Sequence, residues 1–418
     1  MKHKFLFILL FSLVLEGMVA TQAVAGDYVH QVNTLIGTKG TGLTSGYLYP
    51  GATYPYGMVQ FTPSYFSKRS GFVINQLSGG GCEHMGNFPT FPVKGKLKMS
   101  PDNILNYRIN VSEEKGHAGY YEAMVQEDIK AKLTVTERTG MASYEYPADQ
   151  QYGTIIIGGG ISATPIEQAA IVITAPNKCE GYAEGGNFCG LRTPYKVYFV
   201  AEFDTDALET GTWKREELMP NTTFAEGEYS GVYFTFDVNK KKNIQYKIGV
   251  SYVSVENARE NLKAENAEWD FQKIQNQAET KWNHYLGMIE VEGTNPDRTT
   301  QFYTHLYRSF IHPNVCSDVN GEYMGADFRV HKSRSKHYTS FSNWDTYRTQ
   351  IQLLSMLDPE VASDIVISHQ LFAEQSGGSF PRWVMANIET GVMQGDPSPI
   401  LIANAYAFGA RNYDPKPI

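Results

Sequence analysis

The spacing of apolar residues changes its period near residue 250, and this change constrains the fold more than any other feature of the 418-residue sequence. Before that point, short runs such as "YEAMVQEDIKAKLTVTERTGMASYEYP" and "IQYKIGVSYVSV" alternate apolar and polar residues, as half-buried strands do. Gly and Pro separate these runs at short intervals. The pattern predicts a large β-sandwich over residues 27–250.

The sequence takes on helical character after residue 250. Residues 251–290 are rich in charge, contain no Pro and carry apolar residues at helical period, which predicts a long helical linker. Further along the chain, amphipathic segments of helical length alternate with loops. Pro359, Pro397 and Pro399 stand near the predicted starts of two of these helices, where a missing backbone N–H costs little. An all-α domain over residues 291–418, arranged like an α/α toroid, is therefore expected.

The N-terminus indicates export from the cytoplasm. Lys2 and Lys4 precede an apolar stretch of about ten residues, and small residues follow up to Ala25. This pattern is typical of a secretory signal peptide over residues 1–25, cleaved after Ala25 and too short to span a bilayer. No later stretch is long and apolar enough for a membrane helix. We expect a periplasmic or secreted protein without a membrane span.

The four cysteines offer candidate disulfide partners and candidate catalytic groups. Cys179 and Cys189 flank a Gly-rich turn segment, so they form either a disulfide in an oxidising compartment or two free buried thiols. Cys82 stands close to His84, as in cysteine proteases, but the surrounding motif is absent. The glycines before Cys82 favour a glycine-walled pocket edge instead. No Cys/His spacing typical of zinc sites occurs.

Charge and spacing exclude two further classes of ligand. The net charge is −8 and no basic stripe occurs, so nucleic acid is not an expected partner. His312, Asp318, Asp327 and His331 fall within one loop-rich stretch, but they lack the alternation and closing Glu of a calcium loop. No residue of the chain is assigned to a metal on this basis.

Two segments combine aromatic, basic and acidic residues in the way that sugar sites do. Trp344 and Asp345 stand directly before an amphipathic run, and "FPRWVMANIETGVMQGDP" carries Arg382 and Glu389. Aromatic faces pack on the C–H surface of a sugar, and charged groups bind its vicinal hydroxyls. A buried Trp beside an Asp that caps a helix, and a salt-bridged loop, explain the same residues without a ligand.

Five ordered stretches of the sequence resemble glycoside hydrolase family 92, the secreted bacterial exo-α-mannosidases. They are "VNTLIGTKGTG…PGATYPYGMVQFTP", "LSGGGCEHMGNFPTFPVKG", "FYTHLYRSFIHPNVCSDVNGEYMGAD", "YTSFSNWDTYRTQIQLLSMLDPEVASDIV" and "PRWVMANIETGVMQGDPSPILIANAYAFGARNYD". The resemblance implies a multidomain β + α chain with an N-terminal β-sandwich, a helical linker and an (α/α)6 barrel. It also implies a calcium ion and inverting, exo-acting hydrolysis of α-mannosides in mannose-rich N-glycans or mannans, at a cleft between the domains.

The same resemblance assigns site residues. In the family, the Trp-Asp pair of the WDTYR motif faces the mannose pocket, so Asp345 is expected to accept hydrogen bonds from sugar hydroxyls. Amides at the start of the following helix are expected to hold its carboxylate. Trp344, Asp345, Arg382 and Glu389 are expected to converge near the Gly79–Glu83 loop. The implied substrate-binding set is Trp344, Asp345, Arg382, Glu389, Gly81 and Cys82.

The sequence departs from the family pattern in its catalytic motifs. The Glu-x-Asn-x-Trp-like and Gly-Asn-Asp-x-Gly-like motifs, which the resemblance gives to the acid and the base, do not occur. The resemblance therefore places the catalytic residues and most calcium ligands beyond Ile418. We expect only the N-terminal part of a family member, with an incomplete barrel and no activity on its own. The alternatives are a non-catalytic remnant with weak carbohydrate binding, and a replacement acid–base pair of Glu389 and Asp396.

Overall fold

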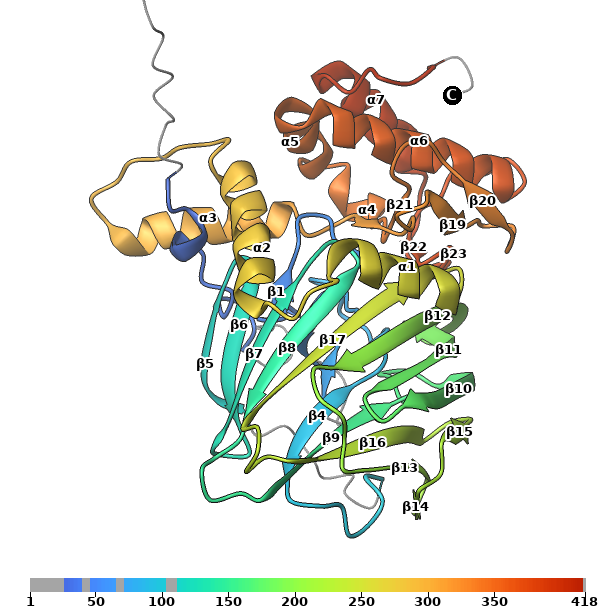
Figure 1. The fold of residues 1–418 in the computed structure, drawn as a ribbon. Coiled ribbons are helices and arrows are strands. Elements are labelled where there is room, and N and C mark those ends of the chain that lie inside the picture. The colour runs from blue at the N-terminus through green and yellow to red at the C-terminus, as the bar shows by residue number, and fades with distance from the viewer. Residues whose placement is uncertain (1–25, 40–45, 65–70, 103–110, 416–418) are drawn as a thin grey trace, which may run out of the picture.

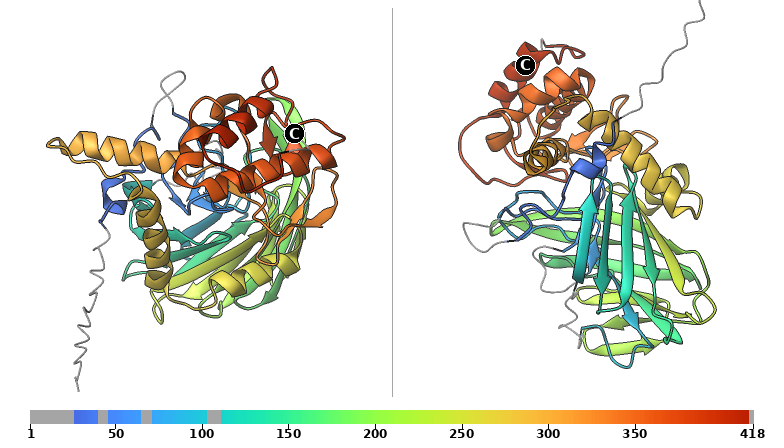
Figure 2. Two further views of the ribbon diagram at one scale, coloured as in Figure 1. Left: turned by 90° about the horizontal axis from the view of Figure 1, so that it is seen from above. Right: turned by 90° about the vertical axis from the view of Figure 1, so that its left-hand side faces the viewer.

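The structure is a computed structural model that describes residues 26–39, 46–64, 71–102 and 111–415. Two large antiparallel sheets form its N-terminal part, and helices with short hairpins form its C-terminal part (Figure 1). Figure 2 shows the helical part covering one end of the sheets. The predicted signal peptide, residues 1–25, lies outside the described residues.

The first sheet has eight strands in the order β1-β2-β3-β4-β9-β16-β13-β14. Its strands are β1 (Ala52–Thr53), β2 (Gln60–Pro63), β3 (Phe72–Val73), β4 (Thr90–Lys94), β9 (Tyr152–Gly158), β13 (Glu209–Lys214), β14 (Glu217–Pro220) and β16 (Ser230–Asp237). β9 pairs with β4 on one side and β16 on the other, and almost all of its residues are buried. It is the central strand of this sheet, which explains its continuous apolar run.

The second sheet has nine strands in the order β15-β10-β11-β12-β17-β8-β7-β6-β5. Its strands are β5 (Val111–His117), β6 (Tyr120–Val125), β7 (Ile129–Val135), β8 (Thr139–Glu145), β10 (Ile166–Ala175), β11 (Lys178–Phe188), β12 (Leu191–Phe203), β15 (Phe224–Glu226) and β17 (Asn243–Ser251). β6 and β11 alternate buried and half-buried residues along most of their length. This is the alternation read from the sequence, and the predicted β-sandwich is confirmed.

Rings fill the space between the two sheets. Phe72 of the first sheet stacks on Tyr144 of the second, with ring centroids 6.2 Å apart. Phe203 lies 4.8 Å from Phe234 and 5.3 Å from Tyr246. All five rings are buried, so they form the centre of the sandwich core.

The helices carry the start signals that the sequence predicts. They are η1 (Val29–Gln31, a 3-10 helix), α1 (Val255–Glu265), α2 (Phe271–Leu286), α3 (Pro296–Ser309), α4 (Asn343–Thr346), α5 (Gln350–Leu357), α6 (Pro359–Gln375) and α7 (Ser398–Phe408). Asp358 caps α6 by accepting the N–H of Val361, and Pro359 takes the first position. Pro399 stands in the first turn of α7.

The segment expected to be one long helical linker forms two helices. Ser254 caps α1 and Asp270 caps α2, so the chain restarts a helix at each of these residues. Between them, the carbonyls of Asn266 and Ala267 each accept a 3.0 Å hydrogen bond from Nζ of Lys247 on β17. A tertiary contact that the local sequence does not reveal therefore accompanies the break in the helix.

The chain segment 49–58 contributes to two hydrophobic cores. Ala52 and Met58 belong to the sandwich core, whereas Tyr49 and Tyr56 belong to the core beneath the helices. The N–H of Tyr56 donates to the carbonyl of Phe310 at 2.8 Å. Nε1 of Trp282 on α2 donates to the carbonyl of Thr53 at 2.6 Å. This segment therefore joins the sheets to the helices.

Short two-stranded sheets interrupt the helical part. They are β18 (Asn314–Val315) with β21 (Tyr338–Thr339), β19 (Glu322–Met324) with β20 (Val330–Lys332), and β22 (Val384–Met385) with β23 (Ile388–Glu389). The helices α5, α6 and α7 pack on one another. A helical domain after the sheets is confirmed, but the incomplete (α/α)6 barrel is not. Among the described residues, no helix combines the length and the apolar character that crossing a membrane requires.

Candidate functional site

The WDTYR motif, residues 344–348, forms the short helix α4 and the turn that follows it. Trp344 and Asp345 lie in the short helix α4, with Trp344 half-buried and Asp345 exposed. The guanidinium carbon of Arg348 lies 5.2 Å from the ring centroid of Trp344 and 4.9 Å from that of Tyr347. The turn thus presents an aromatic face, a carboxylate and a guanidinium at one surface.

Asp345 is held differently from the sequence expectation. Its Oδ2 accepts a hydrogen bond from the hydroxyl of Ser342, the residue before α4. Ser342 makes no side-chain bond to the amides of α4. We expected backbone amides to hold this carboxylate, but the described contact is with a side-chain hydroxyl. Asp345 as a whole is exposed.

The segment Pro381–Thr390 lies directly beside this turn. The N–H of Asn343 donates to the carbonyl of Arg382 at 3.1 Å, and the N–H of Val384 donates to the carbonyl of Phe341 at 2.9 Å. An isolated β-bridge also pairs Ser342 with Trp383. The two segments that sequence analysis selected are therefore joined backbone to backbone.

Glu389 positions this segment through its carboxylate. Oε2 accepts the N–H of Arg382 at 2.7 Å and the N–H of Trp383 at 3.1 Å, and Oε1 accepts the N–H of Gly391 at 3.0 Å. Such a carboxylate is already an acceptor for three backbone donors. Glu389 also lies in a hairpin and Asp396 in the loop after it, so no helix places their carboxylates on one face, and the structure gives the Glu389–Asp396 alternative no support.

Of the two alternatives for Cys179 and Cys189, a shared disulfide or two free thiols, neither holds for Cys189, because Cys189 pairs with Cys82. Cys179 and Cys316 are buried free thiols. Cys189 lies in the hairpin between β11 and β12, which brings it to the loop of Cys82. Cys179 lies near the other end of β11, where it pairs with Ala201 of β12. The bridge leaves no thiol at Cys82, which excludes a cysteine nucleophile there.

The disulfide connects the Cys82 loop to the WDTYR turn through two rings. Phe188, next to Cys189, lies 4.6 Å from Trp383 between ring centroids, and 6.0 Å from His84. Trp383 in turn pairs with Ser342. The contacts therefore run from Cys82 through Phe188 and Trp383 to the turn that holds Asp345.

The predicted substrate-binding residues differ in what they offer a ligand. Trp344 and Asp345 stand at the surface, and Gly81 is exposed beside the ring of Tyr47, to which an added Cβ would come within 3.7 Å. Arg382 is half-buried and its Nε donates to the carbonyl of Val392 at 2.9 Å. Cys82 forms the disulfide with Cys189, and Glu389 accepts hydrogen bonds from backbone amides. Sequence reasoning missed Arg348 and Phe188; an Arg one turn after Trp344 was a readable signal, whereas Phe188 carried none.

The carboxylates at this junction do not fit a calcium ion. Calcium requires six to eight oxygen ligands. Glu389 gives both oxygens to backbone amides, and Asp345 gives one to Ser342. Neither Glu389 nor Asp345 is therefore assigned to the ion.

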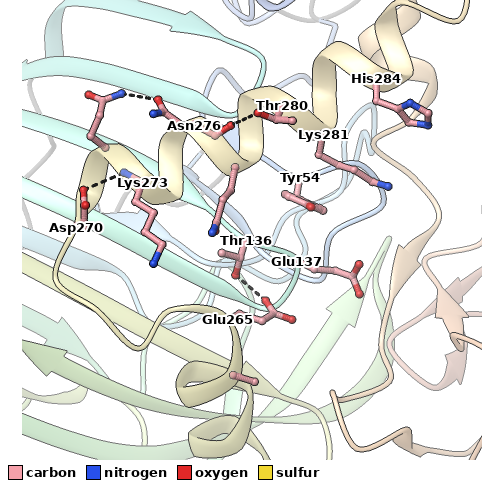
Figure 3. Close-up of a pocket in the computed structure, with 13 residues that line it drawn as sticks. Tyr54, Thr136, Glu137, Glu265, Asp270, Lys273, Asn276, Thr280, Lys281 and His284 are labelled. Carbon is pink, nitrogen blue, oxygen red and sulfur yellow. Dashed lines mark hydrogen bonds between the residues drawn. The ribbon is translucent and has the colours of Figure 1, made fainter. Parts of the chain in front are cut away.

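A cavity of about 920 Å³ opens between α2 and the turn from β7 to β8 (Figure 3). Nη1 of Arg138 lies 2.8 Å from Glu137 and 2.7 Å from Glu265 beside it. Burial alone would raise the pKa of Glu137, but the charges of Arg138 and Lys336 outweigh burial, and the pKa falls below its usual value. An ionised, salt-bridged Glu137 is unsuited to act as a general acid. None of the predicted sugar-binding residues lines this cavity.

Two domain models of one family match the chain in succession. The Glycosyl hydrolase family 92 N-terminal domain matches residues 31–251, and the Glycosyl hydrolase family 92 catalytic domain matches residues 257–417. The chain belongs to glycosyl hydrolase family 92. The boundary between the two family 92 matches falls between β17 and α1, where the sheets give way to helices.

Solved family 92 structures share this fold. An alpha-mannosidase of Bacteroides thetaiotaomicron aligns with a TM-score of 0.85 and 25% identity over 94% of this chain and 56% of its own. It was also solved in complex with mannoimidazole. An inverting mannosidase of the same organism aligns with a TM-score of 0.81 and 26% identity over 94% of this chain and 54% of its own.

A curated relative adds a description of location. An uncharacterized secreted glycosidase of Arthroderma benhamiae is 26% identical over 384 residues, which cover 81% of this chain and 48% of that protein. The chain thus spans about half the length of the relatives it matches.

The family matches also correct the sequence analysis. Because the catalytic-domain model matches residues 257–417, the prediction that the chain resembles only the N-terminal part of a family member is wrong. The same match gives no support to the predicted inactivity of the chain or to a non-catalytic remnant.

Proposed function

We propose that this protein is an exo-acting glycoside hydrolase that removes terminal α-linked mannose from mannose-rich N-glycans or mannans with inversion. The observation that carries the proposal is the backbone pairing of the WDTYR turn with the Arg382–Trp383 segment, beside the loop that Cys82 anchors. The names of the similar solved enzymes, alpha-mannosidase and inverting mannosidase, support the choice of mannose.

The proposed roles follow from what each side chain presents. Trp344 offers an aromatic face for the C–H surface of a sugar, and Asp345 offers a sugar hydroxyl the carboxylate oxygen that Ser342 does not occupy. Arg348 lies over Trp344 and fixes the tilt of its ring. Glu389 keeps Arg382 and Trp383 in place through their amides.

An inverting glycosidase also needs an acid and a base whose carboxyl groups lie about 6.5–9.5 Å apart. We assign neither role to a described residue of this chain. The calcium dependence that the family resemblance implies stays a prediction for the enzyme.

We also propose that the protein works outside the cytoplasm. The Cys82–Cys189 bridge supports this location, since disulfides persist in oxidising compartments. The signal peptide over residues 1–25 stays a prediction from the sequence.

The experiment that tests the mannose site is a calorimetric titration of the purified chain with mannoimidazole and with an α-mannobiose. Asp345→Asn keeps the shape of the side chain and removes its charge. Because a hydrogen bond to a charged group contributes about 1.5–3 kcal/mol, we expect roughly ten- to hundred-fold weaker binding. Trp344→Ala should weaken binding of both ligands as well.

The matched control is Asp396→Asn, which removes an exposed carboxylate from the neighbouring loop. Its affinity should equal that of the wild type. Equal affinities for wild type, Asp345→Asn and Trp344→Ala would overturn the proposed site.

A further inference from the structure

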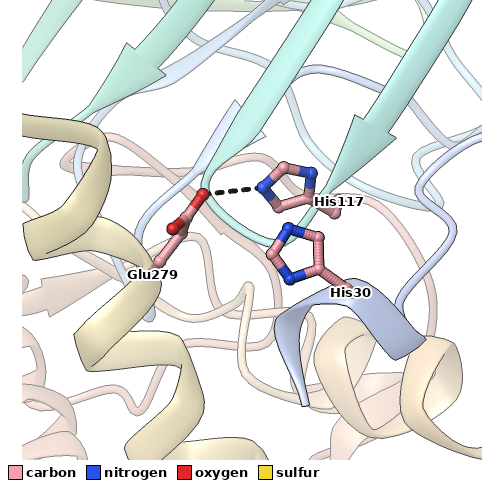
Figure 4. Close-up of side chains that lie close together, drawn as sticks. All are labelled: His30, His117 and Glu279. Carbon is pink, nitrogen blue, oxygen red and sulfur yellow. Dashed lines mark hydrogen bonds and ion pairs between the residues drawn. The ribbon is translucent and has the colours of Figure 1, made fainter. Parts of the chain in front are cut away.

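Two histidines and a glutamate from three different elements meet beside α2 (Figure 4). His30 comes from η1, His117 from the end of β5 and Glu279 from α2. Nε2 of His117 lies 2.8 Å from Oε1 of Glu279, and the rings of His30 and His117 are 4.6 Å apart between centroids. One ligand atom from each residue lies within 4.8 Å of the others.

The fold holds this cluster from several directions. Asn283, one turn after Glu279 on α2, accepts the N–H groups of Tyr28 and Val29 at 2.9 and 3.0 Å, which fixes η1 against the helix. Gln275, one turn before Glu279, donates to its Oε1 at 2.7 Å. The ring of His117 stacks on Tyr120, with centroids 5.0 Å apart. Three residues on one face of α2 therefore place the cluster.

We propose that His30, His117 and Glu279 bind a divalent transition metal ion, with zinc as the representative ion. Two imidazoles and one carboxylate are a donor set that zinc takes in proteins, and imidazole also suits nickel, cobalt and copper. Calcium is not the expected ion, since it prefers oxygen ligands throughout.

Asp27 supplies an outer contact of the kind that metal sites use. Its Oδ1 lies 2.6 Å from Nδ1 of His30, so this carboxylate orients the ring and leaves Nε2 for the ion. A carboxylate behind a ligating histidine fixes the tautomer and raises the basicity of the ligand.

The geometry needs one small adjustment to close around an ion. Ligand atoms about 2.0–2.1 Å from a tetrahedral zinc lie roughly 3.3 Å from one another. His117 and Glu279 are already near that separation at 2.8 Å. His30, whose side chain is 55% exposed, has room to turn towards them. The bound ion then links η1 and the turn between β5 and β6 to α2.

The test uses the whole chain without a histidine tag, stripped of metal with a chelator and kept in saturating calcium. Zinc is titrated by calorimetry, and cobalt is titrated by visible absorption, which reports four-coordinate geometry. We expect one ion per chain. His30→Ala, His117→Ala and Glu279→Gln should each weaken zinc binding roughly ten-fold or more.

The matched control is His284→Ala, an exposed histidine on the same helix, which should bind zinc as the wild type does. His30→Ala changes an exposed side chain, so it tests the site even if His117→Ala disturbs folding. Unfolding of each metal-free variant is measured to separate the two effects. Absence of stoichiometric zinc binding in the wild type, or binding that survives in His30→Ala and Glu279→Gln, would overturn the proposal.

Discussion

The backbone N–H of Ser78 donates a 2.8 Å hydrogen bond to Nε2 of His312, which lies 234 residues later in the chain. Nδ1 of the same ring lies 2.7 Å from Oδ1 of Asn314, so Nδ1 carries the proton and Nε2 accepts. His84 repeats this arrangement, with Nε2 accepting from Leu77 N–H at 2.9 Å and Nδ1 donating to the carbonyl of Cys82 at 2.7 Å. Both rings are therefore neutral in the folded protein.

Acid should destabilise the protein through these histidines. Burial lowers the pKa of His84 and of His312 from 6.5 to about 4. Between pH 6.5 and about 4 the unfolded chain binds more protons than the folded one, so the free energy of unfolding falls as the pH is lowered. At pH 5, fully buried His84 alone accounts for a loss of about 2 kcal/mol relative to neutral pH. Urea unfolding at pH 7.5, 6 and 5 measures this loss.

His84→Gln should make that pH dependence shallower. The comparison uses the slope against pH, so a general loss of stability in the variant does not affect it. His305→Gln removes an exposed histidine on α3 and should leave the slope unchanged. A slope as steep in His84→Gln as in the wild type would show that the buried ring does not govern the acid response.

Reduction of the Cys82–Cys189 disulfide should lower stability. The bridge closes a loop with a sequence separation of 107, and loops of this size correspond to roughly 2–5 kcal/mol. Thermal unfolding with and without dithiothreitol measures the effect, and the double variant Cys82→Ala/Cys189→Ala should not respond to the reductant. In denatured, unreduced protein, the titratable thiols should be those of Cys179 and Cys316. Four titratable thiols would contradict the bridge.

Glu389 should matter more for stability than its exposed neighbour Asp396. Glu389→Ala leaves the amides of Arg382, Trp383 and Gly391 without their acceptor. Hydrogen bonds to a charged group contribute about 1.5–3 kcal/mol each, and water replaces part of this at a half-buried site, so we expect a total loss of roughly 1.5–3 kcal/mol. Urea denaturation midpoints of Glu389→Ala and Asp396→Ala provide the comparison, and equal midpoints would refute the structural role of Glu389.

Arg348→Lys should weaken mannoside binding only modestly. The planar guanidinium lies over the rings of Trp344 and Tyr347, and a lysine ammonium does not reproduce this stacking. An exposed cation–π contact contributes about 0.5–1 kcal/mol, which corresponds to a two- to five-fold change in affinity. Arg411→Lys alters a similar contact with Tyr406, 5.3 Å from its ring, and should have no effect on affinity. A loss in the control as large as in Arg348→Lys would argue against a specific role.

Local patterns revealed the elements of the fold but not all of their breaks. Period and proline start signals predicted the sheets and the starts of α6 and α7. The break between α1 and α2 coincides with the contact of Lys247 with two carbonyls, and a distant ammonium leaves no mark on the local sequence. The partner of Cys189 was unpredictable for a related reason, since disulfide pairing depends on which loops the sheets bring together.

The candidate site also combines features that local sequence predicts with features that depend on tertiary contacts. The residue types of Trp344 and Asp345 indicated a sugar-facing turn, and their family resemblance sharpened that prediction. The role of Glu389 depends on three amide directions that only the folded hairpin sets. The cluster of His30, His117 and Glu279 joins residues from three separate parts of the chain, so no local sequence motif predicts it.

Residues 49–58 contribute to two hydrophobic cores, and this constrains how the sheets and the helices can be recombined. Tyr49 and Tyr56 complete a core built by helices that lie more than two hundred residues downstream, while Ala52 and Met58 serve the sheets. A gene recombined near residue 254 would pair these tyrosines with foreign helices selected against a different surface. We therefore expect that a stable chimera must exchange residues 49–58 together with the helices.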